Sequence, residues 1–160
     1  FFSSYGYELV DPALAEYEES LLVRKHNDLA KQTFRVIDPY SSKMIGIRAD
    51  ITPQISRLAV TRLKNEPRPL RLCYAGKVLR YLGENLYQQR QFFQVGAEII
   101  GEDSAKADSE VMLLALQIFK DIGIKGLSID LNFLRHLHFS LKLKHKYLSY
   151  YLMKCPIILY

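Results

Sequence analysis

Several polar side chains in this sequence stand where a packed strand or helix would make them costly to bury. The first group surrounds an expected junction between a strand and a helix, in the segment Arg48-x-Asp50-x-Thr52-Pro53-Gln54-x-x-Arg57. Further along, Arg80 ends one long apolar run, and Gln94 and Glu98 lie inside the next. Residues two or four apart on a strand face the same side, so Gln94 and Glu98 are expected to share a face.

A small zwitterionic ligand would satisfy such a set of side chains. Burying a charge without a partner is expensive, so a polar pair that faces a packed layer needs one. Carboxylates bind an ammonium group, amides and hydroxyls bind polar atoms, and arginine binds an anion. The alternative is a solvated sheet face whose charges pair with one another. The residue types alone leave both interpretations open.

The familiar motifs of other site chemistries are absent from the sequence. It contains no glycine-rich nucleotide-binding loop, no zinc-protease helix motif and no serine-nucleophile elbow. Cys73 and Cys155 lie far apart and form no CxxC pair, which favours neither a zinc site nor a redox motif. His136 and His138 could bind a metal only from one side of a strand, and no acidic residue accompanies them. We expect no metal and no cofactor, and His26 is expected at the surface.

The net charge of +5 is distributed unevenly along the 160 residues. Of the 22 Lys and Arg residues, five lie beyond Leu131, whereas all 17 Asp and Glu residues lie at or before Asp130. We therefore expect a charge-balanced core at 1–131 and a basic tail of uncertain structure at 132–160. The tail is interpreted as a poorly structured terminus or as sequence outside the original reading frame. A nucleic-acid-binding arm is the less favoured alternative.

Two further features concern the extent of the chain and its cellular compartment. It begins at Phe1 without a methionine, and we expect a fragment of a longer protein. The best candidate for a membrane span, residues 147–160, is too short and contains Lys154. A membrane is therefore not expected as a partner, and the two isolated cysteines favour the reducing cytoplasm.

Hydrophobic periodicity predicts strands that neighbour one another in sequence, with few helices between them. Strands are expected at 1–10, 34–37, 43–48, 70–80, 91–100 and 127–131, and helices at 13–25, 52–66 and 105–122. Thr52 is expected to cap the second helix, with Pro53 at its first position, and Asp103 or Ser104 to cap the third. The two long runs, 70–80 and 91–100, are expected to pair. This order predicts an α+β fold with an antiparallel sheet flanked by helices.

Three stretches resemble the class II aminoacyl-tRNA synthetases. Gly6-Tyr7-x-x-Val10-x-Pro12 is similar to motif 1, the dimer-interface motif. Residues 71–80 (RLCYAGKVLR) are similar to the first strand of motif 2, and residues 89–101 (QRQFFQVGAEIIG) to its returning strand. Within that class, the sequence of these stretches resembles histidyl-tRNA synthetase and the synthetase-like regulatory subunit of ATP phosphoribosyltransferase. The resemblance covers residues 5–131 and implies an incomplete class II core.

The resemblance also implies roles for individual residues. Asp50 stands where the family has an acidic residue for the histidine ammonium group, and Thr52 stands beside it. Gln94 and Glu98 stand at further histidine-contacting positions on the sheet. Arg80 matches the motif 2 arginine, which binds the α-phosphate of ATP in the synthetases. These are the polar residues that the spacing already singles out.

One departure separates the two relatives. The synthetases follow the motif 2 arginine with x-Glu, which helps to hold ATP, whereas Arg80 is followed by Tyr81-Leu82. A leucine side chain accepts no hydrogen bond. Asp50-Ile51-Thr52 likewise stands where the synthetases have Glu-Gly-Thr. Both departures favour the regulatory subunit.

The resemblance therefore implies a non-catalytic protein that binds histidine. It would activate the catalytic ATP phosphoribosyltransferase subunit in the first step of histidine biosynthesis, as a homodimer within a hetero-oligomer. Two alternatives stay open. One is a fragment of a histidyl-tRNA synthetase, which activates histidine with ATP, and the other is a non-functional truncated remnant.

Overall fold

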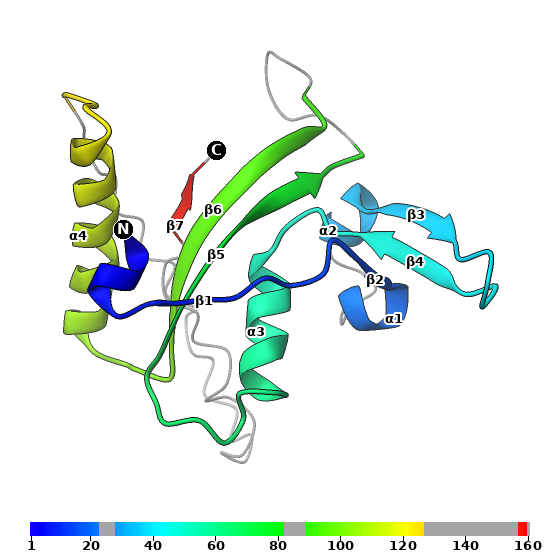
Figure 1. Cartoon of the computed structure of the whole chain (residues 1–160), viewed down its shortest axis with the longest axis horizontal. Coiled ribbons are helices and arrows are strands. Elements are labelled where there is room, and N and C mark those ends of the chain that lie inside the picture. The colour runs from blue at the N-terminus through cyan, green and yellow to red at the C-terminus, as the bar shows by residue number, and fades with distance from the viewer. Residues whose placement is uncertain (23–27, 82–88, 127–156, 160) are drawn as a thin grey trace, which may run out of the picture.

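The computed structural model describes residues 1–22, 28–81, 89–126 and 157–159 (Figure 1). Its helical elements are the 3-10 helix η1 (Phe2–Tyr5) and the helices α1 (Glu18–Leu21), α2 (Asp28–Gln32), α3 (Thr52–Val60) and α4 (Ala105–Asp121). Its strands are β1 (Glu8–Leu9), β2 (Ala15–Tyr17), β3 (Phe34–Ile37), β4 (Met44–Ile47), β5 (Leu70–Leu79), β6 (Gln91–Ile100) and β7 (Ile157–Leu159). These elements have the expected α+β character.

A four-stranded sheet in the order β1-β5-β6-β7 forms the centre of the molecule. Its two long strands, β5 and β6, pair antiparallel from Leu70 opposite Ile100 to Leu79 opposite Gln91. The expected pairing of the two long runs is therefore confirmed. β1 adds to β5 in parallel, and β7 adds to β6 antiparallel. Figure 1 shows β5 and β6 as a long curved pair.

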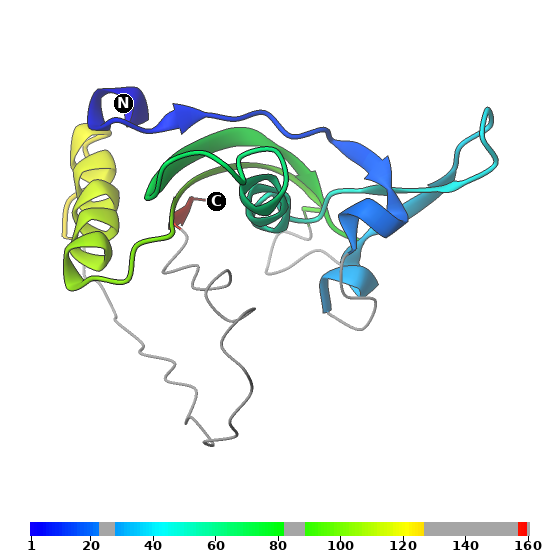
Figure 2. The ribbon, with the colours of Figure 1, turned by 90° about the horizontal axis from the view of Figure 1, so that it is seen from below.

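Helices cover both faces of this sheet. Successive side chains of a strand point to opposite faces, and in β5 and β6 both faces carry apolar side chains that must be buried. On one face, α4 and Tyr7 pack against Cys73, Ala97 and Ile99. On the other face, α3 packs through Ile51, Ile55 and Ala59 against Leu70, Leu72, Tyr74, Val78 and Ile100. Figures 1 and 2 show α4 and α3 on opposite sides of β5 and β6. The polar residues of β6 share the face that α3 covers.

A smaller sheet in the order β2-β4-β3 projects beside the main one (Figure 1). The hairpin of β3 and β4 confirms the expected strands at 34–37 and 43–48. The helix expected at 13–25 is wrong in its first part, because Ala15–Tyr17 pair with Ile45–Ile47 of β4 as a strand. Only Glu18–Leu21 form the helix α1. Tertiary pairing thus overrides a weak local helix pattern.

The first strand and the helix expected at 52–66 are both shorter than expected, and α3 ends at Val60. The strand expected at 1–10 is reduced to Glu8–Leu9, since Phe2–Tyr5 form η1, which ends at Gly6. Helix α4 begins after Ser104, whose side chain accepts a hydrogen bond from the Ala107 amide. That cap and the helix behind it confirm the prediction.

Several expectations fall outside the described residues. They concern the strand at 127–131, the histidines 26, 136 and 138, Cys155, and the basic tail apart from Ile157–Leu159. The division at residue 131 stays a prediction. Among the residues that the structure describes, no helix is long and apolar enough to cross a membrane. In the same residues, no group of three or more His, Cys, Asp or Glu could hold a metal ion.

Candidate functional site

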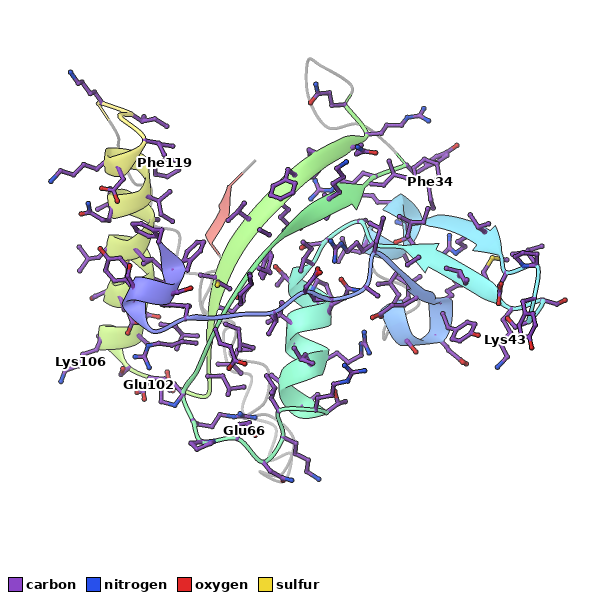
Figure 3. All side chains as sticks on the ribbon, in the orientation of Figure 1. Phe34, Lys43, Glu66, Glu102, Lys106 and Phe119 are labelled. Carbon is purple, nitrogen blue, oxygen red and sulfur yellow. The ribbon has the colours of Figure 1, made fainter. Side chains whose placement is uncertain are left out.

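The side chains of Gln94 and Glu98 project from β6 toward the start of α3. Their side chains are 0% and 1% exposed, and they share the sheet face beneath α3, as their spacing predicts. In Figure 3 the side chains of α3 meet those of β5 and β6 in the space between these elements. A solvated sheet face, the alternative interpretation of the sequence, is thereby wrong.

Gln94 connects the sheet to the turn that precedes α3. Its Oε1 accepts a hydrogen bond from the Ile51 amide at 3.0 Å, and its Nε2 donates to Asp50 Oδ1 at 2.9 Å. The same Oδ1 accepts from the Thr52 amide at 3.0 Å. A side chain that accepts from the amide two residues ahead forms an Asx turn. Asp50 is therefore fixed by β6 and by its own turn.

Thr52 contributes its hydroxyl to the site and not to the helix cap. The expected cap is wrong, because Ile51 occupies the N-cap position and no side chain caps α3 there. The Thr52 hydroxyl lies 2.8 Å from the Tyr74 hydroxyl and donates to Glu98 Oε1 at 3.1 Å. Tyr74 also donates to Glu98 Oε1, at 3.3 Å. Three oxygens from α3, β5 and β6 thus form one triangle.

Glu98 is held in an environment that disfavours its charge. Burial raises its pKa, the hydrogen bonds from Thr52 and Tyr74 lower it in part, and the nearby charge of Asp50 raises it, so that the pKa is about 7 in all. Its second oxygen, Oε2, is buried and has no hydrogen-bond partner within the described part of the chain. A buried acceptor without a partner costs about 1–3 kcal/mol. The site therefore presents an acceptor that a donor group can satisfy.

Tyr74 is a site residue that the sequence analysis missed. It lies in the middle of an apolar strand, where a tyrosine reads as core, and it is 1% exposed. Burial raises the pKa of its phenol, so the hydroxyl remains a hydrogen-bond donor. The spacing Gln94-x-Gly96-x-Glu98 could have indicated a large neighbouring side chain in the site, because it places a glycine between two polar residues on one face of the strand. Gly96 lies opposite Tyr74, and the ring covers it.

Arg80 lies at the edge of this cluster. It follows the end of β5, is 6% exposed, and donates from Nε to the Ala49 carbonyl at 3.2 Å. Its guanidinium carbon lies 4.9 Å from the centre of the Phe92 ring. The structure therefore brings Arg80 beside the residue that precedes Asp50. Its expected role in binding an anion stays a prediction.

Three other residues of the polar segment have partners outside the cluster. Arg48 donates to the Pro12 carbonyl, and Gln54 Nε2 donates to the Ala13 carbonyl at 2.8 Å. Arg57 pairs with Glu16. These side chains hold residues 12–16 against the start of α3. Of the polar segment, only Asp50 and Thr52 therefore join Gln94 and Glu98.

Comparison with known proteins is consistent across sequence and structure. The family model described as histidyl-tRNA synthetase matches residues 1–146. ATP phosphoribosyltransferase regulatory subunits from Paramagnetospirillum magneticum and Rhodospirillum centenum are each 52% identical over 130 residues, which is 81% of this chain and 34% of theirs. The chain thus spans about a third of the length of these curated relatives.

Solved structures give the same fold. One is described as an ATP phosphoribosyltransferase regulatory subunit/histidyl-tRNA synthetase from Bacillus halodurans. It has a TM-score of 0.64 and 31% identity, over 77% of this chain and 31% of that one. A histidine–tRNA ligase subunit from Alicyclobacillus acidocaldarius has a TM-score of 0.63 and 28% identity, over 78% and 35%. The chain belongs to the histidyl-tRNA synthetase family and carries part of its class II aminoacyl-tRNA synthetase fold.

Proposed function

We propose that this chain is part of a histidine-binding regulatory subunit. In this proposal it activates a separate catalytic ATP phosphoribosyltransferase subunit, in the first step of histidine biosynthesis, and does not itself activate amino acids. It acts as a homodimer within a hetero-oligomer in the cytoplasm. The names of its curated relatives support the partner, and the similarity of residues 6–12 to motif 1 supports the homodimer.

The observation that carries the proposal is the buried Oε2 of Glu98, which has no partner among the described residues. Histidine offers two kinds of donor, an ammonium group and an imidazole N–H. Asp50 supplies a second carboxylate near Glu98, and Gln94 fixes its orientation through Oδ1. A zwitterion with an additional donor on its side chain matches two carboxylates in one site better than an apolar amino acid does.

Space around the site adds one expectation. A hollow of about 20 Å³ is lined by Asp50, Pro53 and Thr33, but by neither Gln94 nor Glu98. That volume suits about one water molecule. We therefore expect histidine to bind together with a movement of neighbouring side chains, and the cost of that movement lowers the apparent affinity.

The absence of adenylate chemistry is proposed from the end of motif 2. Leu82 stands where the synthetases have a glutamate, and a leucine cannot accept a hydrogen bond from ATP or its bound groups. Arg80 is retained, so an anion can still be attracted to the site. Histidine-dependent exchange of pyrophosphate with ATP is therefore expected to be absent.

The test is calorimetric titration of L-histidine into the protein and two matched variants. Glu98→Gln removes the negative charge at constant shape, and Glu66→Gln makes the same change at an exposed position beyond the end of α3 (Figure 3). We expect Glu98→Gln to weaken binding by about 10- to 100-fold, the range for hydrogen bonds to a charged group, and Glu66→Gln to leave it unchanged. Equal affinities in all three proteins, or no binding by the parent, would overturn the proposal.

A second measurement addresses the partner and the competing activity. The protein is mixed with a catalytic ATP phosphoribosyltransferase subunit, and its rate is followed with and without histidine. Stimulation that histidine reverses is expected, because histidine binding and activation are then coupled between two sites. Histidine-dependent ATP–pyrophosphate exchange by the protein alone would instead identify an amino-acid-activating enzyme.

A further inference from the structure

Tyr74 reaches the site from the neighbouring strand by lying across Gly96. An added Cβ on residue 96 would lie 2.3 Å from both Cζ and the hydroxyl oxygen of Tyr74. Real Cβ atoms do not approach other atoms this closely, so any side chain at position 96 would displace the ring. The phenol therefore occupies the space between Gln94 and Glu98 on their shared face. The pairing of β5 with β6 therefore fixes the position of the Tyr74 ring.

The hydroxyls of Tyr74 and Thr52 provide only two protons for three oxygen–oxygen contacts. The shortest contact, 2.8 Å, joins the two hydroxyls, and the contacts to Glu98 Oε1 are 3.1 Å from Thr52 and 3.3 Å from Tyr74. Either hydroxyl can donate to the other, and both lie within reach of Oε1. Glu98 therefore always has at least one hydroxyl donor, and it has two when both hydroxyls point to Oε1, so this oxygen is occupied from within the protein.

We propose that Tyr74 is a positioning residue of this site, which holds the Thr52 hydroxyl and Glu98 Oε1 in one triangle and leaves Oε2 as the acceptor for the ligand. That the ligand is histidine rests on the proposed function above. The triangle itself does not depend on the identity of the ligand. It rests on the burial of Tyr74 and Glu98, which are each 1% exposed, and on the three oxygen contacts.

The groups around Glu98 determine what removal of the Tyr74 hydroxyl does. Thr52 of α3 and Tyr74 of β5 donate to the carboxylate, and Asp50 adds a like charge from the turn before α3. Gln94 of the same strand is neutral and binds Asp50. Without the Tyr74 hydroxyl, the charged form of Glu98 loses one donor while burial and Asp50 remain. The pKa of Glu98 then rises above its present value of about 7.

The test compares Tyr74→Phe with Tyr40→Phe, which makes the same change at a residue that is 98% exposed. Phenylalanine keeps the ring over Gly96, and circular dichroism at each pH checks that the variant is folded. The titration of Glu98 is followed by ¹³C NMR of the side-chain carboxyl, assigned by its loss in Glu98→Gln. We expect an upward shift of roughly one pH unit in Tyr74→Phe and none in Tyr40→Phe. An unchanged titration of Glu98 in Tyr74→Phe overturns the inference.

Histidine affinity provides the second readout. Tyr74→Phe is expected to weaken binding by about tenfold near pH 7, and to move the midpoint of the affinity–pH curve upward with Glu98. If Glu98→Gln loses binding while Tyr74→Phe changes neither readout, the proposed function stands and the role of Tyr74 falls. If the parent binds no histidine but the Glu98 titration shifts in Tyr74→Phe, the proposed function falls and the positioning role stands.

Discussion

The guanidinium group of Arg48 passes over Gly76, so closely that a Cβ on residue 76 would lie 2.2 Å from Nη2 of the arginine. Arg48 is 4% exposed and donates from Nε to the Lys77 carbonyl at 2.9 Å and from Nη1 to the Pro12 carbonyl. One buried cation thus joins β5 to the segment before β2. Burial lowers the pKa of Arg48, while the charges of Asp11 and Glu16 raise it.

Gly76→Ala is expected to destabilise the protein by displacing this guanidinium. Overpacking of a well-filled site costs about 1–3 kcal/mol, and here the displaced group also leaves two carbonyls without their donor. Urea unfolding measures the cost, with Ala75→Ser on the exposed side of the same strand as the control. In an Arg48→Met background the flexible methionine can yield, so the same alanine should cost less. An equal cost in both backgrounds would contradict the contact.

Glu98→Gln is expected to stabilise the protein increasingly as the pH rises. The pKa of Glu98 lies near 7 in the folded state, against an ordinary value of 4.5. Between these values the folded state binds the proton more tightly, so the stability due to the neutral form is complete below about pH 4.5 and is lost as pH rises through 7. Glutamine stays neutral. The variant should gain on the order of 3 kcal/mol over the parent between pH 4 and pH 8.

Urea unfolding at pH 5, 6, 7 and 8 measures this difference for Glu98→Gln. Glu66→Gln provides the control, because an exposed carboxylate should contribute no slope in this range. A constant difference between parent and Glu98→Gln across the range would mean that Glu98 titrates normally in the folded protein. Its burial would then lack the expected electrostatic cost.

Glu110→Gln is expected to loosen the contact between α4 and the opposite face of the sheet. Glu110 accepts two hydrogen bonds from Arg71, at 2.7 and 2.8 Å, and one from Tyr7 at 3.1 Å. The Arg71 hydrogen bond lowers the pKa of Glu110, so its stabilising effect is present above the ordinary pKa and is lost as pH falls through the lowered value. Because both side chains of the ion pair are about a third exposed, solvent screening limits the effect to about 1 kcal/mol. Thermal unfolding at pH 7 and pH 3 should show parent and variant converging in acid.

The strands of the site can be predicted from the sequence, because the alternation of side chains along a strand is a local pattern with a period of two. Gln94 and Glu98 are four residues apart in a long apolar run, and a period of two places them on one face wherever the strand lies. The pairing of residues 70–80 with 91–100 follows from two long runs joined by a polar segment. The structure confirms both expectations.

The errors arise where a side chain has two possible partners and only the fold selects one. Thr52 reads as a helix cap, but Asp50 accepts from its amide, and its hydroxyl then binds Tyr74 and Glu98. The local pattern of residues 15–17 predicts a helix, but in the structure these residues pair with β4 as a strand. Tyr74 reads as core, since strand periodicity gives its face but not the glycine opposite it. These choices depend on neighbours that are distant in sequence.

Thr52→Val and Thr52→Ser together test whether the hydroxyl serves the site or the helix. If the hydroxyl capped α3, valine would cost about 1 kcal/mol of helix stability. Because the Thr52 amide donates to Asp50, we expect both variants to keep the far-ultraviolet circular dichroism of the parent. Valine should weaken histidine binding by about tenfold or more and raise the pKa of Glu98, since the carboxylate loses a donor, whereas serine should restore both. Loss of helix in Thr52→Val with unchanged histidine affinity would return Thr52 to the role of a cap.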